Sequence, residues 1–377
     1  MFDVIIIGSG FAGAVMAERL ATQQDKTILI IEQRNHIGGN CFDKKDENGI
    51  LVHRYGPHLF HTNSLKVWKY LSKFTEWQVY FHKVLAQIDG QQVPVPFNLN
   101  SLQKLFPQFM TEKFIESLVD QYGYNQKITI ADLMKTKNEN LKYLAEYINE
   151  KFFVHYTEKQ WGIKEVASEV TARVPIFIGY DDNYFTDRFQ AVPQKGYTEL
   201  FHNMLNHKNI KLLTNTNFKE VMELKDDKFY FLGQPFNGQV IFTGQVEELF
   251  ENKFGSLEYR SLDLKFETLN LDEYQKTATI NYPNNYEFTR ITEFKKIHPV
   301  TTGVTTILKE YPQHYIPGVN TPYYPVFDSE NKLRYEMYAT AASQVKNLIL
   351  LGRLAEYKYY NMDNIVEHAL NLFEEKF

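Results

Sequence analysis

Short apolar runs interrupted by glycine dominate the first part of the chain. Residues 2–7 and 27–31 are apolar almost throughout, and each is long enough for a strand that is buried on both faces. Between them, residues 8–13 contain three glycines, and residues 14–20 have the apolar spacing of a helix. This order predicts a strand, a glycine turn, a helix and a second strand, which together open a parallel α/β sheet.

Helical and strand patterns alternate over the rest of the chain. Apolar residues recur at helical intervals from 101 to 153, and residues 87–96 are typical of a hairpin around an Asp-Gly turn. A last apolar run at 348–351 precedes a helical pattern from 362 to 376, for which Asn361 is the expected N-cap. Further strand patterns occupy residues 210–213, 229–232, 240–244, 277–282 and 302–309.

The closing strand suits the same sheet as the first one, so the middle segments are expected to be insertions into that sheet. We therefore predict an α/β protein with α+β inserts, in which a discontinuous Rossmann-like domain carries a helical domain and an antiparallel β-sheet domain. The Rossmann-like domain is expected at 1–75, 195–248 and 343–377, the helical domain at 98–165, and the sheet domain at 76–97, 166–194 and 249–342.

Three segments have neither helical nor strand periodicity. Residues 156–162, 171–175 and 180–188 interleave polar and aromatic side chains, and we expect them to be loops. Such a composition is typical of a binding loop, although a solvated loop has the same pattern. The pattern alone leaves both interpretations open.

Composition and charge exclude several classes of protein. The chain has 377 residues, 44% of them hydrophobic, 23% charged and 15% aromatic, with a net charge of −5. This composition is that of a globular protein of more than one domain, and no basic stripe indicates a nucleic-acid partner. Cys41 is the only cysteine, so no disulfide within the chain is expected. We predict neither a signal peptide nor a membrane span, and we expect a cytoplasmic protein.

The glycine turn has the chemistry of a dinucleotide site. Gly8 allows the tight turn, Gly10 allows the backbone to approach a pyrophosphate, and Gly13 allows the helix to pack closely on the strand. The start of the helix supplies unpaired N–H groups and a partial positive charge to the phosphates. Glu32, at the end of the second strand, lies where a carboxylate that binds the ribose is expected.

A second polar segment favours a flavin dinucleotide over a nicotinamide one. Arg34 is followed by Gly38, Gly39 and Asn40, which offers a cation and another close backbone approach to the same pyrophosphate. No second G-x-G-x-x-G motif follows in the sequence, so a separate nicotinamide domain is not expected. Histidines at 53, 58 and 61 lack the spacing of a metal site, and no metal is predicted. His58 follows a Gly-Pro turn from which it can face a ligand.

Taken together, these segments resemble the bacterial UDP-galactopyranose mutase family over essentially the whole chain. The resemblance implies a flavoenzyme that interconverts the pyranose and furanose forms of UDP-galactose and supplies the furanose sugar to cell-surface polysaccharide. It is carried by nine motifs in the order of the family, at 8–13, 34–40, 55–62, 156–162, 182–185, 257–261, 288–290, 323–326 and 352–360.

The resemblance also implies a mechanism. The reaction is redox-neutral overall but needs reduced FAD, whose N5 attacks the anomeric carbon and expels UDP. The adduct opens through an iminium, the sugar ring closes at its other size, and UDP attacks again, so that one difficult rearrangement becomes several easier displacements. The implied partners are a UDP-sugar substrate, an external electron donor for the flavin and a second copy of the chain in a homodimer.

Residue roles follow by position within the matching motifs. The resemblance implies that Arg173, Arg290 and His58 are catalytic residues, the two arginines by holding the diphosphate. The implied substrate contacts are Phe152, Tyr156, Trp161, Tyr184, Phe185, Arg260, Tyr324 and Tyr359. The implied cofactor contacts are Gly8, Gly10, Phe11, Ala12, Gly13, Glu32, Gln33, Arg34, Gly39, Asn40, His58, Arg353, Asn361 and Met362.

Five positions depart from the family pattern and keep alternative substrates open. They are His155, Phe177, Phe327, Leu351 and Asn361, of which Phe177 and Asn361 each remove a charge that the family commonly carries. A related nucleotide sugar, such as UDP-N-acetylgalactosamine or a dTDP-deoxysugar like fucose, is therefore an alternative. A flavin oxidase of the amine-oxidase type shares the opening motif, and a non-catalytic binder of flavin or nucleotide sugar is the remaining possibility.

Overall fold

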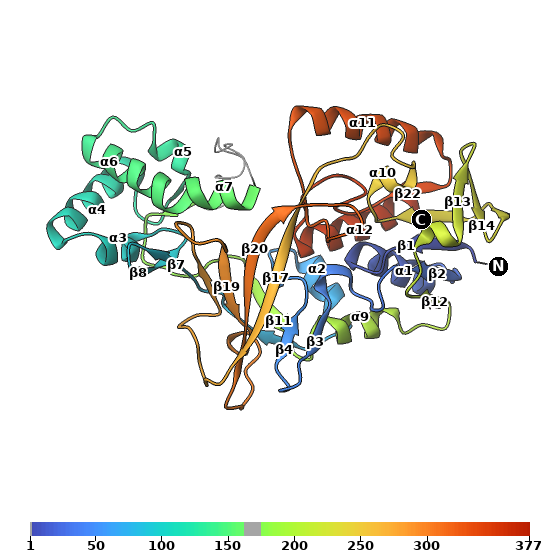
Figure 1. The fold of residues 1–377 in the computed structure, drawn as a ribbon, viewed down its shortest axis with the longest axis horizontal. Helices are drawn as coiled ribbons and strands as arrows, with labels where there is room; N and C mark the ends of the chain where they lie inside the picture. Colours follow the sequence, from blue (N-terminus) through green and yellow to red (C-terminus); the bar gives the residue numbers. More distant parts are fainter. Residues whose placement is uncertain (1, 162–174) are drawn as a thin grey trace.

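The parallel sheet predicted from the apolar runs lies at one end of the molecule. The computed structural model describes residues 2–161 and 175–377. In the sheet, strands from the start, middle and end of the chain lie side by side, and every pair is parallel. Figure 1 shows both termini beside this sheet. Its order is β12 (Ile210–Leu213), β2 (Ile28–Ile31), β1 (Val4–Ile7), β16 (Gln239–Phe242) and β22 (Leu348–Leu350).

Both faces of the parallel sheet are covered, which explains why its strands are apolar throughout. Val4 and Ile6 pack into the core beneath the helices, whereas Ile5 and Ile7 point to the opposite face. A three-stranded antiparallel sheet covers that second face. The helices are α1 (Phe11–Gln23), α9 (Tyr197–Leu205) and α12 (Met362–Lys376), and the covering strands are β13 (Met222–Lys225), β14 (Lys228–Phe231) and β15 (Gln234–Phe236). This confirms the predicted Rossmann-like fold.

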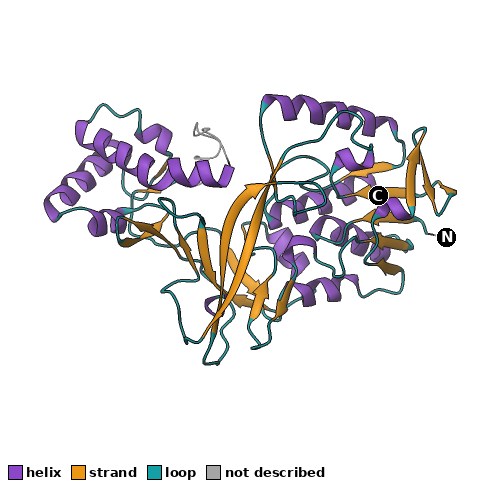
Figure 2. Ribbon diagram, viewed as in Figure 1, coloured by secondary structure: helices purple, strands orange, loops and turns teal. Residues whose placement is uncertain are grey.

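A long, largely antiparallel sheet runs through the middle of the molecule (Figure 2). Its two longest strands pair over ten positions, from Arg260 opposite His314 to Leu269 opposite Thr305. The expected hairpin at 87–96 forms its far edge, and Asp89 and Gly90 have the positive φ of its turn. The order is β21 (Tyr324–Pro325), β17 (Tyr259–Leu269), β20 (Thr305–His314), β19 (Arg290–Glu293), β18 (Thr279–Asn281), β7 (Val84–Ile88) and β8 (Gln91–Val95).

Helices gather at the other end, next to the hairpin of β7 and β8 (Figure 1). Their apolar residues, with Phe97 and Ile178, form a core of their own. The last two helical segments run on without a break, through one turn of π-helix at Asn149–Val154. The helices are α3 (Leu99–Leu105), α4 (Gln108–Tyr122), α5 (Ile130–Leu133), α6 (Glu139–Ile148) and α7 (His155–Trp161).

The structure corrects one element of the sequence analysis. The part of the expected loop at 156–162 that the structure describes, residues 156–161, belongs to helix α7. Its buried face carries the polar residues Thr157 and Gln160, which are 4% and 7% exposed. A helix that buries polar side chains has no apolar stripe, so apolar periodicity does not reveal it.

Further elements complete the fold. Within the described ranges 2–161 and 175–377, no helix has both the length and the apolar content needed to span a bilayer. The remaining strands are β3 (Asp43–Lys45), β4 (Leu51–His53), β5 (Phe60–Thr62), β6 (Trp77–Val79), β9 (Lys127–Ile128), β10 (Ile176–Phe177) and β11 (Phe189–Pro193). The remaining helices are α2 (Leu65–Leu71), α10 (Val246–Leu249), α11 (Ser329–Gln344) and 3₁₀ turns at Gly39–Cys41, Phe218–Glu220 and Phe294–Lys296.

Candidate functional site

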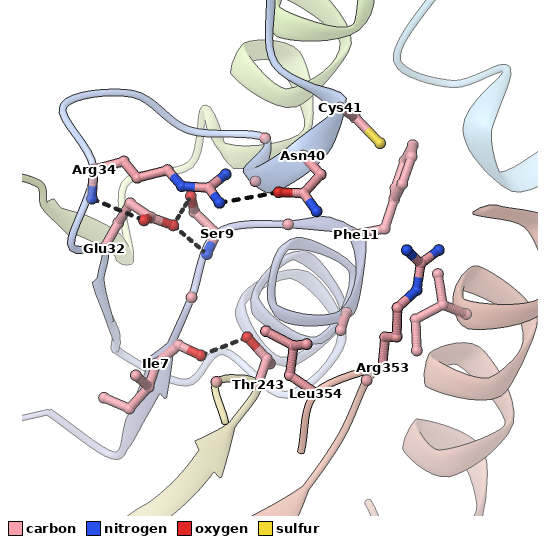
Figure 3. Close-up of a pocket in the computed structure, with 18 of the residues that line it drawn as sticks. Ile7, Ser9, Phe11, Glu32, Arg34, Asn40, Cys41, Thr243, Arg353 and Leu354 are labelled. Carbon is pink, nitrogen blue, oxygen red and sulfur yellow. Dashed lines mark hydrogen bonds between the residues drawn. The ribbon is translucent and has the colours of Figure 1, made fainter. Parts of the chain in front are cut away.

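A large cleft opens at the carboxyl ends of the parallel strands. Gly8 follows β1, Glu32 follows β2 and Thr243 follows β16, and all three line it (Figure 3). Parallel α/β sheets bind their ligands at this edge. The space that it bounds is about 1330 Å³, open mouth included. Its lining reaches from Glu32 at the end of β2 to Met362 at the start of α12.

At the glycines, backbone atoms without side chains form the floor of the cleft. Gly8 has φ +100°, and a Cβ there would lie 2.1 Å from Thr243 Oγ1, which donates to Ile7 O at 2.7 Å. A Cβ on Gly39 would approach Gly10 Cα to 3.1 Å. Gly13 does not line the cleft, because it packs against the Gly8 carbonyl, 2.1 Å from where its Cβ would be. These close approaches are what a pyrophosphate at the N-terminus of α1 requires.

Glu32 is buried and already bonded to the glycine turn. Its Oε2 accepts from Ser9 N at 3.0 Å and from Ser9 Oγ at 2.7 Å, and its Oε1 accepts from Arg34 N at 2.9 Å (Figure 3). A carboxylate has about four acceptor positions, so Oε1 can still accept a hydrogen bond from a ligand. Glu32 thus couples the turn to the second strand as well as lining the cleft.

Arg34 carries an unpaired cationic nitrogen. Its Nη2 donates to Asn40 Oδ1 at 3.0 Å, and its guanidinium carbon lies 4.2 Å from the centre of the Tyr55 ring. The Tyr55 hydroxyl in turn lies 2.8 Å from His36 Nε2. Arg34 Nη1 is buried with no hydrogen-bond partner in the part of the chain that the structure describes. A buried donor of this kind needs an acceptor, and an anionic group in the cleft would supply one.

The opposite wall brings together residues from 58 and from 352–362. His58 Nδ1 lies 2.8 Å from Gly56 O, and burial lowers the pKa of His58 to about 4, so its ring is neutral at pH 7. Arg353 donates to Tyr323 O at 3.0 Å and to Tyr360 O at 2.7 Å. Asn361 occupies the expected N-cap of α12, although its side chain makes no capping bond.

Nearly all the predicted cofactor residues meet in this cleft. Gly13 is the exception, for the packing reason given above. The cleft also contains residues that the sequence analysis did not select; Tyr323, Gly352 and Leu354 fell within quoted motifs, whereas Thr216 and Phe218 carried no signal. The predicted residues that line it are Gly8, Gly10, Phe11, Ala12, Glu32, Gln33, Arg34, Gly39, Asn40, His58, Arg353, Asn361 and Met362.

A second polar cluster surrounds Arg290 at the start of β19. Arg290 Nη2 donates to the Tyr156 hydroxyl at 2.8 Å, and its Nε lies 3.4 Å from Glu310 Oε2. Burial opposes the charge of Arg290, but the Glu310 carboxylate and the hydroxyls of Tyr156, Tyr324 and Tyr184 together outweigh this effect and raise the pKa of Arg290. Burial also raises the pKa of Glu310, against the influence of Arg290. The guanidinium therefore stays charged in a partly buried position, with 30% of the side chain exposed.

Tyrosines connect the Arg290 cluster to the cleft. Burial raises the pKa of Tyr184 and of Tyr324 to about 12, and Arg290 acts on both in the opposite direction. The rings of Tyr324 and Tyr359 stack at 6.1 Å. Arg353, which lines the cleft, lies 5.4 Å and 5.2 Å from the centres of these two rings. Two cations and a set of phenol groups thus adjoin the dinucleotide cleft.

The other expected substrate residues have different surroundings. Phe152 packs edge-on against Phe97 at 5.3 Å, and Phe185 stacks on His61 at 3.8 Å. Arg260 is only 4% exposed and donates to the carbonyl oxygens of Gln160 and Lys159 at 3.1 and 3.2 Å. Its guanidinium therefore holds the end of α7.

The side-chain surroundings of two expected site residues, Trp161 and Arg173, are not described by the structure. Trp161 is the last residue of α7, and Arg173 lies outside the described residues. Among residues 2–161 and 175–377, no group of three or more His, Cys, Asp or Glu side chains is arranged to hold a metal ion.

Comparisons with known proteins agree with this geometry. Residues 151–359 match the family model described as UDP-galactopyranose mutase, and residues 6–74 match an NAD(P)-binding Rossmann-like domain. The chain is 35% identical to dTDP-fucopyranose mutase of Escherichia coli over 98% of this chain and 97% of that one. It is 32% identical to a probable UDP-galactopyranose mutase of Klebsiella pneumoniae over 99% and 94%.

Solved structures share the fold. A crystal structure of reduced UDP-galactopyranose mutase superposes with a TM-score of 0.75 at 16% identity, covering 100% of this chain and 93% of that one. A putrescine oxidase superposes with a TM-score of 0.59 at 9% identity, covering 99% and 98%. At these identities the superpositions establish the architecture alone, which flavin mutases and amine oxidases have in common.

Proposed function

Because the chain belongs to the UDP-galactopyranose mutase family and is thus a nucleotide-sugar pyranose–furanose mutase, we propose that it interconverts UDP-galactopyranose and UDP-galactofuranose with reduced FAD. The observation that carries the proposal is the Arg290 cluster beside the dinucleotide cleft. An oxidase needs no cationic clamp for a diphosphate, whereas a mutase must hold the nucleotide while the sugar is detached from it.

Residues of the cleft fit the FAD pyrophosphate. The backbone at Gly8 and Gly10 and the N-terminus of α1 would bind the phosphates, with the unpaired Arg34 Nη1 as the cationic contact. Glu32 Oε1 would accept a ribose hydroxyl. Reduced FAD, when bound, would supply the nucleophile for the anomeric carbon. An external electron donor would keep the FAD reduced. The neutral ring of His58 would face the flavin.

The Arg290 cluster would hold the substrate diphosphate. Arg290 presents a charge on a partly buried side chain, so its attraction for phosphate oxygens is stronger than it would be in bulk water. Burial keeps the phenol groups of Tyr184 and Tyr324 protonated at neutral pH, and their hydroxyls can donate hydrogen bonds to the same oxygens, as can that of Tyr359. The family position of Arg173 makes it the second expected cation. Phe152 and Tyr156 would flank the base.

A dTDP-linked 6-deoxy sugar is the second candidate substrate. The E. coli relative named dTDP-fucopyranose mutase shares 35% identity with this chain, against 32% for the K. pneumoniae relative. Asn361, where the family commonly has an aspartate, lines the cleft and removes one negative charge from it. The reaction type is the same for both substrates.

Competing turnover tests the proposal. The purified protein, loaded with FAD and reduced with dithionite under argon, is given equimolar UDP-galactopyranose and dTDP-fucopyranose, and the sugar nucleotides are separated by chromatography. The proposal expects a higher kcat/KM for UDP-galactose. A higher kcat/KM for dTDP-fucose would make that sugar nucleotide the substrate in place of UDP-galactose. Conversion of neither sugar would reject the proposal.

A further inference from the structure

Lys159, on α7, places its ammonium group in a ring of backbone carbonyls. Its Nζ lies 2.5 Å from Tyr282 O, 3.0 Å from Asn284 O, 3.1 Å from Tyr286 O and 3.3 Å from Phe288 O. An ammonium has three N–H donors, so the four carbonyls take up all its hydrogen-bonding capacity and replace its water. No ion pair of Lys159 with a carboxylate is found among residues 2–161 and 175–377.

The carbonyl ring belongs to the turn that leads into Arg290. Residues 282–289 connect β18 to β19, and Arg290 is the first residue of β19. The turn is closed by a hydrogen bond from Tyr282 N to Thr289 O at 2.8 Å, and the rings of Tyr286 and Phe288 each pack against that of Tyr282 at 4.9 Å. The ammonium therefore binds a compact turn that ends one residue before Arg290, a cation of the proposed diphosphate site.

The same face of α7 makes two further contacts with the central sheet. Tyr156, three residues before Lys159, accepts the hydrogen bond from Arg290 Nη2. Arg260, on β17, donates to the carbonyl oxygens of Lys159 and Gln160. Positions three and four apart share one side of a helix, so Tyr156, Lys159 and Gln160 together attach α7 to the sheet.

We propose that Lys159 is a positioning residue for the diphosphate site: its ammonium fixes α7 against the turn before β19 and so sets the Tyr156–Arg290 contact. The inference rests on the proposed function only for its ligand, a nucleoside diphosphate. Burial lowers the pKa of Lys159 to about 8, which leaves it mostly protonated at pH 7. Without the ammonium, four carbonyls lose a charged donor, and the turn loses its connection to α7.

Chemical rescue separates this role from general packing. Lys159→Ala removes the three outer methylenes and the ammonium, which n-propylammonium reproduces, whereas Lys159→Met keeps the length without the charge. On FAD-loaded protein, both variants should raise the Kd for UDP and dTDP at least about tenfold, as expected when bonds to a charged group are lost. In Lys159→Ala, n-propylammonium should restore the Kd, and tetramethylammonium, which has no N–H, should not. Lys142→Met, on the exposed face of α6, is the matched control.

Unchanged affinity in both variants, or loss in Lys159→Ala without rescue by n-propylammonium, would overturn the proposal. If Lys159→Ala does not fold, the Kd of Lys159→Met for UDP and dTDP decides the question. If the wild-type protein binds neither UDP nor dTDP, the proposed function fails, and thermal unfolding then decides the positioning role. The Tm losses of Lys159→Met and Tyr156→Phe should sum to more than the loss in the double variant, because both act on one contact. Additive losses would contradict the proposal.

Discussion

Replacing Arg34 by methionine should weaken the binding of FAD without lowering the stability of the apoprotein. Methionine keeps the length of the side chain but removes the charge. The guanidinium makes a hydrogen bond to Asn40 and a stacking contact with Tyr55, and its buried Nη1 has no hydrogen-bond partner among the described residues. An unpaired buried donor is a cost to the folded state, so its removal offsets the contacts that are lost with it.

The expected size of the effect follows from the contact that the cofactor would make. A hydrogen bond to a charged group contributes about 1.5–3 kcal/mol, which corresponds to an increase in the Kd for FAD of about 10- to 150-fold. Stability of the apoprotein should change by less than about 1 kcal/mol, because the lost stacking contact and the relieved donor oppose each other.

Flavin fluorescence provides the assay. Apoprotein is titrated into FAD, and urea unfolding of the apoprotein gives its stability. Arg54→Met is the matched control, since Arg54 also stacks on an aromatic ring, at 4.5 Å from the centre of Phe266, but does not line the cleft. A Kd for Arg34→Met within twofold of both wild type and the control would refute the assignment of Arg34 to the pyrophosphate.

Three further predictions concern the substrate cluster and pH. Arg290→Met should lower kcat/KM ~100-fold, as loss of a charge-stabilising donor does, while the flavin absorbance of the purified protein stays unchanged; normal turnover would exclude Arg290 from the clamp. Arg173→Ala should lower turnover strongly while FAD stays bound. Turnover at the wild-type rate would exclude Arg173 from binding the diphosphate. Burial lowers the pKa of His298 from 6.5 to about 4, so the unfolded state binds its proton first and stability should fall by ~3 kcal/mol between pH 6.5 and 4. Urea unfolding should show a smaller acid loss in His298→Gln, and an equal loss would contradict this.

The parallel sheet and its cleft could be predicted because local chemistry dictates them. Strands β1 and β2 are buried on both faces and therefore apolar at every position. The glycines at 8 and 10 are required wherever backbone must approach a phosphate. These constraints act within about thirty residues, so a single sequence displays them.

The residues around Arg290 could not be derived from the sequence pattern in the same way. Arg290, Tyr156 and Tyr324 come from separate strands and helices, and only the folded chain brings them together. Helix α7 escaped detection because its buried side chains are polar, and the contact of Lys159 with four carbonyls leaves no trace in the sequence pattern. Family resemblance selected Arg260 for the substrate, whereas its hydrogen bonds in the structure go to the end of α7.

The departures from the family pattern have different surroundings. Leu351 is fully buried in the core below the parallel sheet, so its size and apolarity matter for packing. Phe177 pairs with Lys127 between β9 and β10, and Phe327 is 46% exposed. Of the five, which include His155, only Asn361 lines the cleft. Asn361→Asp is therefore the substitution through which the substrate preference should be examined first.

The most direct test of the central claim is turnover as a function of the redox state of the flavin. Wild-type protein is assayed anaerobically with UDP-galactofuranose, once oxidised and once reduced with dithionite, while the absorbance of the flavin is recorded. The account predicts many molecules of UDP-galactopyranose per reduced flavin, with the flavin still reduced at the end, and none from the oxidised protein. Conversion at equal rates in both states, or oxidation of the flavin in step with the substrate, would contradict it.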